Sequence, residues 1–459
     1  MDRKLSFSQY SIVGMMLFAL FFGAGNLIFP AQLGQYAGSE VWIAIAGFLI
    51  TGVGLPLLGI LAIGYSKSSD LQDLSSRVHP VFGLVFTALL YLTIGPFFAL
   101  PRTGAVSYEV GIAPFIGEGN LAIGLIIFSV IFYAISLWLS LNPSKLVDNV
   151  GKYLSPAILL TLAALLIMAI IKPMGSPEAP QEAYASGAFL KGFTEGYNTM
   201  DALASLVFGI IVIATVRKLG VNSPKGILGA TLKSGIVAAA LLAIVYTGIA
   251  YLGATSTNTL GLMDTGGPVL SGASAHYFGT FGASLLAIII TLACLTTAIG
   301  LTVANAEFFH KLTPKISYKT YVVIFSVFSL IVTNAGLANI ITYSIPVLMF
   351  LYPLAIVLII LAFLSPLFKH DRLVYVSAMT VTFFIAIIDG FKTLTSSLEI
   401  ANPGWLQAII DFYASSLPLY ADGLGWLLPA LIVIAITGVI ARSKKDVNVQ
   451  GVQNEAYNK

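Results

Sequence analysis

Residues 8–36 read SQYSIVGMMLFALFFGAGNLIFPAQLGQY, an apolar stretch that is long enough to cross a bilayer but is interrupted near its middle. The interruption is the FGAGN segment at residues 22–26, and Pro30 follows one turn later. Glycines weaken a helix, and a proline removes one backbone donor. In lipid, the backbone groups freed in this way must be satisfied by protein or by a water-filled cavity. The break therefore indicates either a kink for close helix packing or a binding site.

The composition is that of a polytopic membrane protein. Of the 459 residues, 58% are hydrophobic and only 9% are charged, and the mean hydropathy is +0.93. A soluble domain carries roughly 25% charged residues. One cysteine, Cys294, excludes a disulfide framework and a multi-cysteine metal site. The net charge of +3 gives no indication of nucleic-acid binding, and we expect none.

Hydropathy predicts twelve membrane spans, each long enough for a hydrocarbon core of roughly 30 Å. The third is interrupted at Gly95, Pro96 and Pro101, and the sixth contains a second break. The predicted spans cover residues 8–36, 41–65, 80–111, 121–141, 146–171, 187–216, 224–253, 281–309, 318–334, 337–364, 373–391 and 425–441.

The distribution of lysine and arginine predicts the orientation. With both termini in the cytoplasm, 19 of the 23 basic residues fall on the inner side, as the positive-inside rule expects. The other four, on the outer side or in the outer part of a helix, are Arg102, Lys172, Lys191 and Lys392. We expect residues 442–459 to form a polar, disordered cytoplasmic tail.

The sixth span carries acidic residues within the membrane. It contains TEGYNTMDALAS at residues 194–205, with Glu195 about a third of the way in and Asp201 near the middle. A carboxylate at this depth needs a partner or a wet cavity. Asp201 either belongs to a structural ion pair, caps a half-helix that begins there, or lines a binding site.

The two breaks lie in corresponding spans of two halves, which is the sequence pattern of secondary transporters. Half-helix N-termini attract a carboxylate, and unwound carbonyls suit a cation such as Na⁺. In the eighth span, the adjacent hydroxyls of Thr296 and Thr297 offer further cation ligands. The alternative for these threonines is that they bond back to the preceding turn.

Three motifs carry a resemblance to a known family. They are GAGNLIFP at 23–30, GPFFALPRTGAVSYE at 95–109 and GYNTMDALASLVFG at 196–209. With them, the chain resembles the bacterial branched-chain amino acid carriers (the BrnQ, or LIVCS, family) from residue 7 to about 442. That family is similar to the amino acid–polyamine–cation superfamily, which has the leucine-transporter fold.

The resemblance implies an all-α integral membrane protein of twelve helices, with a five-plus-five inverted repeat and broken helices 1 and 6. The repeats would cover residues 8–171 and 187–364, with two peripheral helices at 365–441 and the tail at 442–459. It also implies import of leucine, isoleucine and valine across the plasma membrane of a bacterium, driven by Na⁺ or H⁺.

The resemblance further implies site residues. Those for substrate binding are Gly23, Ala24, Gly25, Asn26, Thr199, Asp201 and Ala202. Those for a Na⁺ site are Ala19 and Phe22, through their carbonyls, with Thr296 and Thr297. Asp201 departs from many superfamily relatives, which have an uncharged residue there. It would hold the substrate ammonium, bind the cation or carry a proton, and the sequence leaves this choice open.

We therefore expect a secondary symporter and no enzyme, with a carrier for alanine or another neutral amino acid, or a passive channel, as alternatives. The four histidines are widely separated and form no HExxH pair, and no phosphate-binding GxxxxGK[ST] string occurs. We expect a small-molecule substrate and the lipid bilayer as partners, no cofactor beyond the coupling ion, and no obligate protein partner. Arg102, Glu109, Glu195 and Glu307 remain unranked as gates or structural ion pairs.

Overall fold

The computed structural model describes residues 5–141 and 146–457, and every regular element in these ranges is helical. The α-helices up to residue 171 are α1 (Phe7–Phe21), α2 (Ala24–Ala37), α3 (Val41–Leu49), α4 (Leu55–Tyr65), α5 (Leu71–Ser76), α6 (Pro80–Leu92), α7 (Ala99–Gly111), α8 (Leu121–Leu141) and α9 (Leu146–Ile171). Those after it are α10 (Glu182–Ala185), α11 (Ala188–Glu195), α12 (Asp201–Lys218), α13 (Pro224–Leu260), α14 (Gly266–Leu312), α15 (Tyr318–Thr333), α16 (Leu337–Leu364), α17 (Arg372–Ser397), α18 (Gly404–Ser416) and α19 (Leu427–Tyr457). The all-helical prediction is confirmed for these residues.

Short 3₁₀ or π-helical turns join or extend several of these helices. They are η1 (Gly38–Glu40), η2 (Ile50–Gly54), η3 (Thr93–Phe97), η4 (Ala113–Phe115), η5 (Glu118–Asn120), η6 (Gly196–Thr199) and η7 (Ser365–Phe368). Residues 142–145, within the first predicted repeat, and residues 458–459 of the predicted tail lie outside the described residues.

Seven helical segments of the described chain are long and apolar enough to cross a membrane, and a bent pair makes an eighth. That pair joins Ala188–Thr199 to Asp201–Lys218 with a bend of 47°. Four shorter apolar helices have 10–17 residues each. They are Phe7–Phe21, Pro156–Ile171, Tyr318–Thr333 and Leu427–Ser443. Length and composition alone therefore leave the twelve-span topology a prediction.

Helical breaks lie where the glycines and prolines of the sequence indicate them. α1 ends before α2 begins at Ala24, and α11 and η6 end before α12 begins at Asp201. The third predicted span is interrupted at Gly95, whose φ and ψ of −98° and −126° are not helical. The expected interruption at Pro101 is wrong, because this proline lies in the first turn of α7, where a missing backbone donor costs no helical hydrogen bond.

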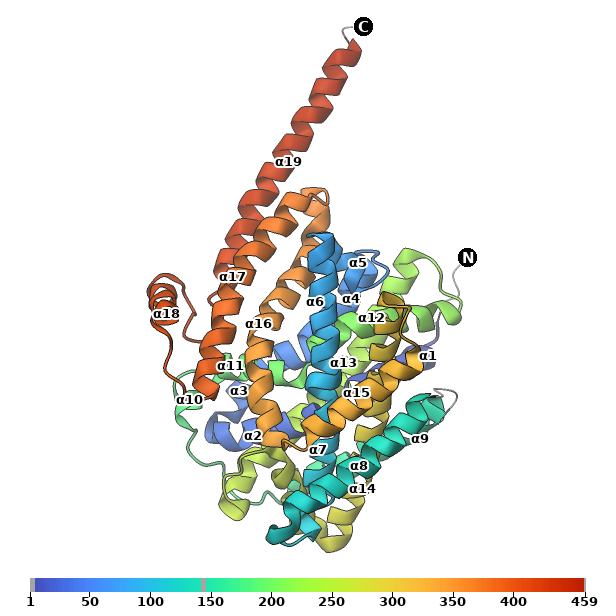
Figure 1. Cartoon of the computed structure of the whole chain (residues 1–459), viewed down its shortest axis with the longest axis vertical. Coiled ribbons are helices and arrows are strands. Elements are labelled where there is room, and N and C mark those ends of the chain that lie inside the picture. The colour runs from blue at the N-terminus through green and yellow to red at the C-terminus, as the bar shows by residue number, and fades with distance from the viewer. Residues whose placement is uncertain (1–4, 142–145, 458–459) are drawn as a thin grey trace.

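The expected disorder of residues 442–459 is also wrong as far as Tyr457. The structure continues α19 to this residue, and the helix projects beyond the rest of the chain in Figure 1. Each residue added to an existing helix contributes a backbone hydrogen bond without a new nucleation step, and no proline stops the helix here.

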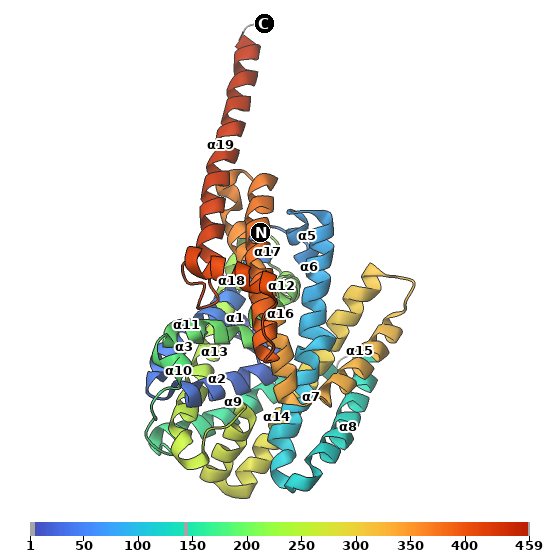
Figure 2. The same ribbon diagram turned by 60° about the vertical axis from the view of Figure 1, so that its left-hand side comes forward.

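Small residues bring the broken helices close to their neighbours. A Cβ on Gly34 of α2 would overlap the carbonyl oxygen of Ala250 in α13, and a Cβ on Gly253 of α13 would overlap that of Ala31 in α2. A Cβ on Gly47 of α3 would likewise overlap a backbone carbonyl of α11. Such glycine contacts are how membrane helices pack without a hydrophobic driving force. Figure 2 shows α3, α10 and α11 on one flank and α8 beside α15 on the opposite flank.

Candidate functional site

The first break is organised by Asn26. α1 ends at Phe21, Gly23 is extended, and the Gly23 amide donates to Asn26 Oδ1 at 2.9 Å. A regular helix would instead send this amide to the carbonyl of Ala19, four residues earlier. The last carbonyls of α1 and the first backbone amides of α2 therefore have no hydrogen-bond partner within a continuous helix.

The second break places Asp201 at the first position of α12. Met200 precedes it in the left-handed conformation, with φ of 63°, and occupies the N-cap position without a side-chain cap bond. The Asp201 amide donates to Thr199 Oγ1 at 3.3 Å. The Asp201 carboxylate is therefore not the helix cap that one sequence interpretation proposed, and it points to other partners.

Those partners come from α2 and α13. Asn26 Nδ2 donates to Asp201 Oδ2 at 2.6 Å, and the Tyr246 hydroxyl donates to the same oxygen at 2.8 Å. Asn26 Nδ2 also donates to the Tyr246 hydroxyl. All three residues are buried. Because Asn26 lies in α2, Asp201 in α12 and Tyr246 in α13, this triad joins both breaks to α13. Hydrogen bonds to a charged group are stronger than those between neutral groups.

Arg102 of α7 enters the same region from a third side. Its Nη1 donates to the carbonyl of Asn198 at 2.6 Å, and its Nη2 donates to Ser344 Oγ at 3.1 Å. The guanidinium lies over the ring of Phe29, 4.9 Å from its centroid. The arginine side chain is thus buried between α2, η6 and α16.

A cavity of about 50 Å³ lies where these groups meet. It is room for only a few water molecules. Both breaks contribute to its wall, together with α7 and α14. Its lining residues are Leu20, Phe21, Gly23, Ala24, Gly25, Asn26, Ile94, Ala99, Arg102, Thr103, Thr199, Met200, Asp201, Ala204, Phe208, Thr297 and Leu301. The wall thus combines an acidic side chain, a basic side chain and several hydroxyls with aliphatic and aromatic side chains.

The cavity brings together most of the residues that the sequence singled out. Seven of the eleven line it, namely Gly23, Ala24, Gly25, Asn26, Thr199, Asp201 and Thr297. The other four, which do not line it, are Ala19, Phe22, Ala202 and Thr296. The structure gives the positions of these eleven residues, and their roles in binding substrate or Na⁺ stay predictions.

The two threonines of α14 differ in position. Thr296 and Thr297 both donate back to the carbonyl of Ala293, at 2.8 and 3.1 Å, as threonines in membrane helices commonly do. Of the two, Thr297 reaches the first break, because a Cβ on Gly23 would lie 3.5 Å from its Oγ1. Each hydroxyl oxygen keeps acceptor capacity for a cation.

Arg102 and Tyr246 are not among the predicted substrate or Na⁺ residues. Arg102 was named only as an unranked gate or ion-pair residue, and Tyr246 was not named at all. A signal for Arg102 existed, since an ionisable residue within a predicted span indicates a functional site by default. Because Arg102 was grouped with the basic residues of the outer side, its position within the third span was not taken as an indication of a site. Tyr246 is a phenol in the middle of an apolar span, and a buried hydroxyl there needs a partner. The unranked Glu195 instead pairs with Lys191 at 2.7 Å, and the unranked Glu109 accepts from Thr265 at 2.7 Å.

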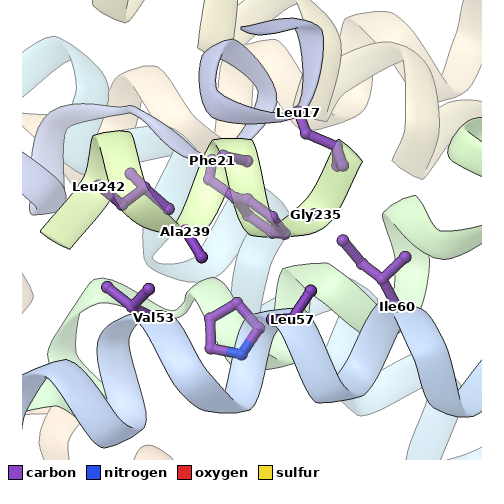
Figure 3. A pocket seen from close by; sticks show the side chains of 10 residues that line it. Leu17, Phe21, Val53, Leu57, Ile60, Gly235, Ala239 and Leu242 are labelled. Atoms are coloured by element: carbon purple, nitrogen blue, oxygen red, sulfur yellow. The ribbon is translucent and has the colours of Figure 1, made fainter. Parts of the chain in front are cut away.

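A second, purely apolar gap lies behind α1. Figure 3 shows Leu17 and Phe21 of α1 near Gly235, Ala239 and Leu242 of α13. Val53 of η2 and Leu57 and Ile60 of α4 complete the labelled lining. Its volume is only about 10 Å³. Phe21 lines both this gap and the polar cavity.

The same arrangement of helices occurs in membrane transporters of known structure. The chain matches the inward-facing conformation of Mhp1 with a TM-score of 0.61 and 15% identity, covering 97% of this chain and 92% of that one. It matches MhsT in complex with L-phenylalanine with a TM-score of 0.55 and 16% identity, covering 96% and 100%. At such identities the likeness concerns the fold, which is that of a multi-pass membrane transporter.

Sequence comparison then identifies the family. The family model for "Branched-chain amino acid transport protein" matches residues 7–444, and the chain belongs to this family of transporters, which are not enzymes. The branched-chain amino acid permease BrnQ of Bacillus subtilis is 49% identical, over 94% of this chain and 96% of its own. BraB of the same organism is 48% identical, over 96% and 97%. BrnQ of Escherichia coli is 39% identical, over 95% and 96%.

Proposed function

We propose that this protein is a secondary active symporter that imports leucine, isoleucine and valine with Na⁺ or H⁺. The observation that carries the proposal is the cavity between the two helix breaks, where the first turns of α2 and α12 meet opposite charges and apolar side chains. A zwitterionic amino acid needs this combination of a charged wall and an apolar wall. The names of its relatives, which are branched-chain amino acid permeases, support the substrate class.

The apolar part of the wall supports overlapping specificity. It is formed by aliphatic and aromatic side chains, including Leu20, Ile94, Phe208 and Leu301. One methylene group in such a pocket is worth only about 1–3 kcal/mol, so leucine, isoleucine and valine are poorly separated. The cavity is small in the present arrangement, and we infer that α1, α2, α11 and α12 move against the other helices to admit substrate and release it.

The topology that we propose has twelve spans. The segment Ala24–Tyr65 supplies the second span and part of the first, which Phe7–Phe21 completes. The other three shorter apolar helices supply or complete the fifth, ninth and twelfth spans. The inverted repeats are residues 8–171 and 187–364, followed by peripheral helices at 365–441. Both termini lie in the cytoplasm of a bacterial cell, as the excess of basic residues in the alternate loops supports.

We propose two alternative coupling mechanisms. In the first, Na⁺ binds to Thr297 and Thr296 with the carbonyls of Ala19 and Phe22, since hydroxyl and carbonyl oxygens suit a hard cation. In the second, Asp201 takes up a proton and releases it during the cycle. In both, the ion drives transport only if it binds the outward and inward states with different affinity.

The proposal is tested by uptake of labelled leucine into proteoliposomes that carry the purified protein. A Na⁺ gradient and a pH gradient are imposed separately, and unlabelled isoleucine, valine and alanine serve as competitors. We expect accumulation under one gradient, inhibited by isoleucine and valine more than by alanine. Stronger inhibition by alanine would indicate a carrier for small neutral amino acids. Equilibration without accumulation under either gradient would overturn the symporter.

A further inference from the structure

We propose that Arg102 binds the carboxylate of the transported amino acid and makes the site selective for α-amino acids over amines and amides. This inference rests on the proposed function, because it assigns one end of the proposed substrate to one residue. It concerns a residue of α7, outside both helix breaks, to which the sequence motifs assign no role.

Arg102 lies in the cavity wall and has N–H donors that form no hydrogen bond within the described part of the protein. The residue is only 2% exposed and lines the cavity. Its bonds to Asn198 and Ser344 use two of the five N–H donors of a guanidinium. Its Nε has no hydrogen-bond partner among the described residues. A buried donor without a partner is costly, and a ligand oxygen in the cavity removes that cost.

The charge of Arg102 also lacks a direct counterion. Among the residues that the structure describes, no carboxylate lies within 4.0 Å of its guanidinium. The cavity wall has one other charged residue, Asp201. That carboxylate already accepts from Asn26 and Tyr246. An α-amino acid carries both of the missing complements, a carboxylate for Arg102 and an ammonium for Asp201.

The position of the guanidinium is fixed from several elements. Asn198 belongs to η6 at the second break, Ser344 to α16, and Phe29 to α2 just beyond the first break. A Cβ on Gly25 would lie 3.4 Å from Arg102 Nη1, so the arginine also lies against the first turn of α2. A guanidinium held in this way offers a planar fork to a carboxylate, which a lysine ammonium does not. The carboxylate would then lie between Arg102 and the amides of α2.

The competing interpretation is a purely structural arginine that satisfies the Asn198 carbonyl and holds the second break in place. The two roles differ in ligand dependence. A structural strut supports binding of every ligand equally, whereas a carboxylate-binding residue matters only for ligands that have a carboxylate. Leucinamide, which keeps the amine and the side chain of leucine but has no carboxylate, separates the two roles.

The test measures dissociation constants of leucine and leucinamide for the purified full-length protein by isothermal titration calorimetry, at fixed pH and Na⁺. The variants are Arg102→Gln and Arg102→Lys. The control is Arg77→Gln, which removes an arginine that binds Ser66, Ser68 and Tyr375 away from the cavity. Thermal melting of each variant shows whether it is folded.

We expect the wild type to bind leucine at least ten times more tightly than leucinamide. Arg102→Gln weakens leucine binding about ten- to hundred-fold, the range expected for lost hydrogen bonds to a charged group, and leaves leucinamide within about three-fold of its wild-type value. Arg102→Lys, which keeps the charge, gives a smaller loss for leucine, and it replaces Arg102→Gln if that variant does not fold. Arg77→Gln leaves both constants unchanged.

Three outcomes would overturn the inference. Equal affinity of the wild type for leucine and leucinamide would show that no group recognises the carboxylate. Equal loss for both ligands in the arginine variants would assign Arg102 a structural role. Unchanged leucine binding in a folded Arg102→Gln would remove the residue from the site. If the wild type bound no leucine, isoleucine or valine, the proposed function itself would fail, and the inference with it.

Discussion

The side-chain amide of Asn26 donates to the carboxylate of Asp201 at 2.6 Å, joining residues that are 175 positions apart in the chain. Each residue lies in the first turn of a helix that follows a break, Asn26 in α2 and Asp201 in α12. The same Asn26 accepts from the Gly23 amide through its Oδ1. One side chain thus shapes the first break and connects it to the second by a hydrogen bond.

Replacing Asp201 by asparagine tests the charge at this junction. The variant keeps the shape but removes a negative charge and one acceptor from Asn26 and Tyr246, so we expect the half-saturating leucine concentration to rise at least about ten-fold. Initial uptake rates in proteoliposomes measure this effect. The matched control is Asp389→Asn, since Asp389 is a carboxylate of α17 that is as buried but does not line the cavity. Equal transport by both variants would show that the charge of Asp201 is not used.

Replacing Gly25 by leucine tests the space at the first break. A Cβ there already lies 3.4 Å from Arg102 Nη1 and 3.5 Å from the Asn198 carbonyl, so a longer side chain must fill the cavity. We expect leucine uptake to be abolished while the amount of protein in the membrane stays normal. Gly300→Leu is the control, because a Cβ on this glycine of α14 meets nothing within 4 Å. Wild-type uptake by Gly25→Leu would contradict a substrate site at this break.

The paired threonines test the coupling ion. If Na⁺ drives transport, the double change Thr296→Ala with Thr297→Val raises the half-saturating Na⁺ concentration of leucine uptake several-fold. We expect most of this effect from Thr297 alone, because its side chain reaches the first break and that of Thr296 does not line the cavity. Thr302→Val, which removes another back-bonded hydroxyl of α14, serves as the control. An unaltered Na⁺ dependence in the double variant would exclude this cation site.

The contact between α2 and α13 tests what holds the first broken helix in place. A Cβ on Gly34 would overlap the backbone carbonyl of Ala250, which has no room to retreat within its helix. We therefore expect Gly34→Ala to destabilise the protein by about 1–3 kcal/mol, as overpacking does. Thermal unfolding in detergent would show this as a lower melting temperature. Gly229→Ala, on a glycine of α13 with open space around it, should leave the melting temperature equal or slightly higher.

Much of the fold follows from the sequence, since long apolar segments form helices in lipid and a cluster of glycines or a buried carboxylate can mark a break. The first break was predicted from the glycines of residues 22–26 and the second from Glu195 and Asp201, and the structure breaks its helices at both places. The predicted interruption at Pro101 and the predicted disorder beyond Ala441 were wrong, because α7 contains Pro101 and α19 continues past Ala441. The effect of a residue on a helix depends on its position within the helical turn, and this position depends on where the helix begins.

By itself, the sequence determined that the chain is a helical membrane protein, that two of its helices are broken, and that an acidic residue lies at one break. These properties depend on composition and on neighbours within one helix. Only the tertiary structure decided that Tyr246 and Asn26 bind Asp201, and that Arg102 lines the same cavity as Asp201. Partners of a buried charge come from helices distant in the chain, and their identity depends on how those helices pack.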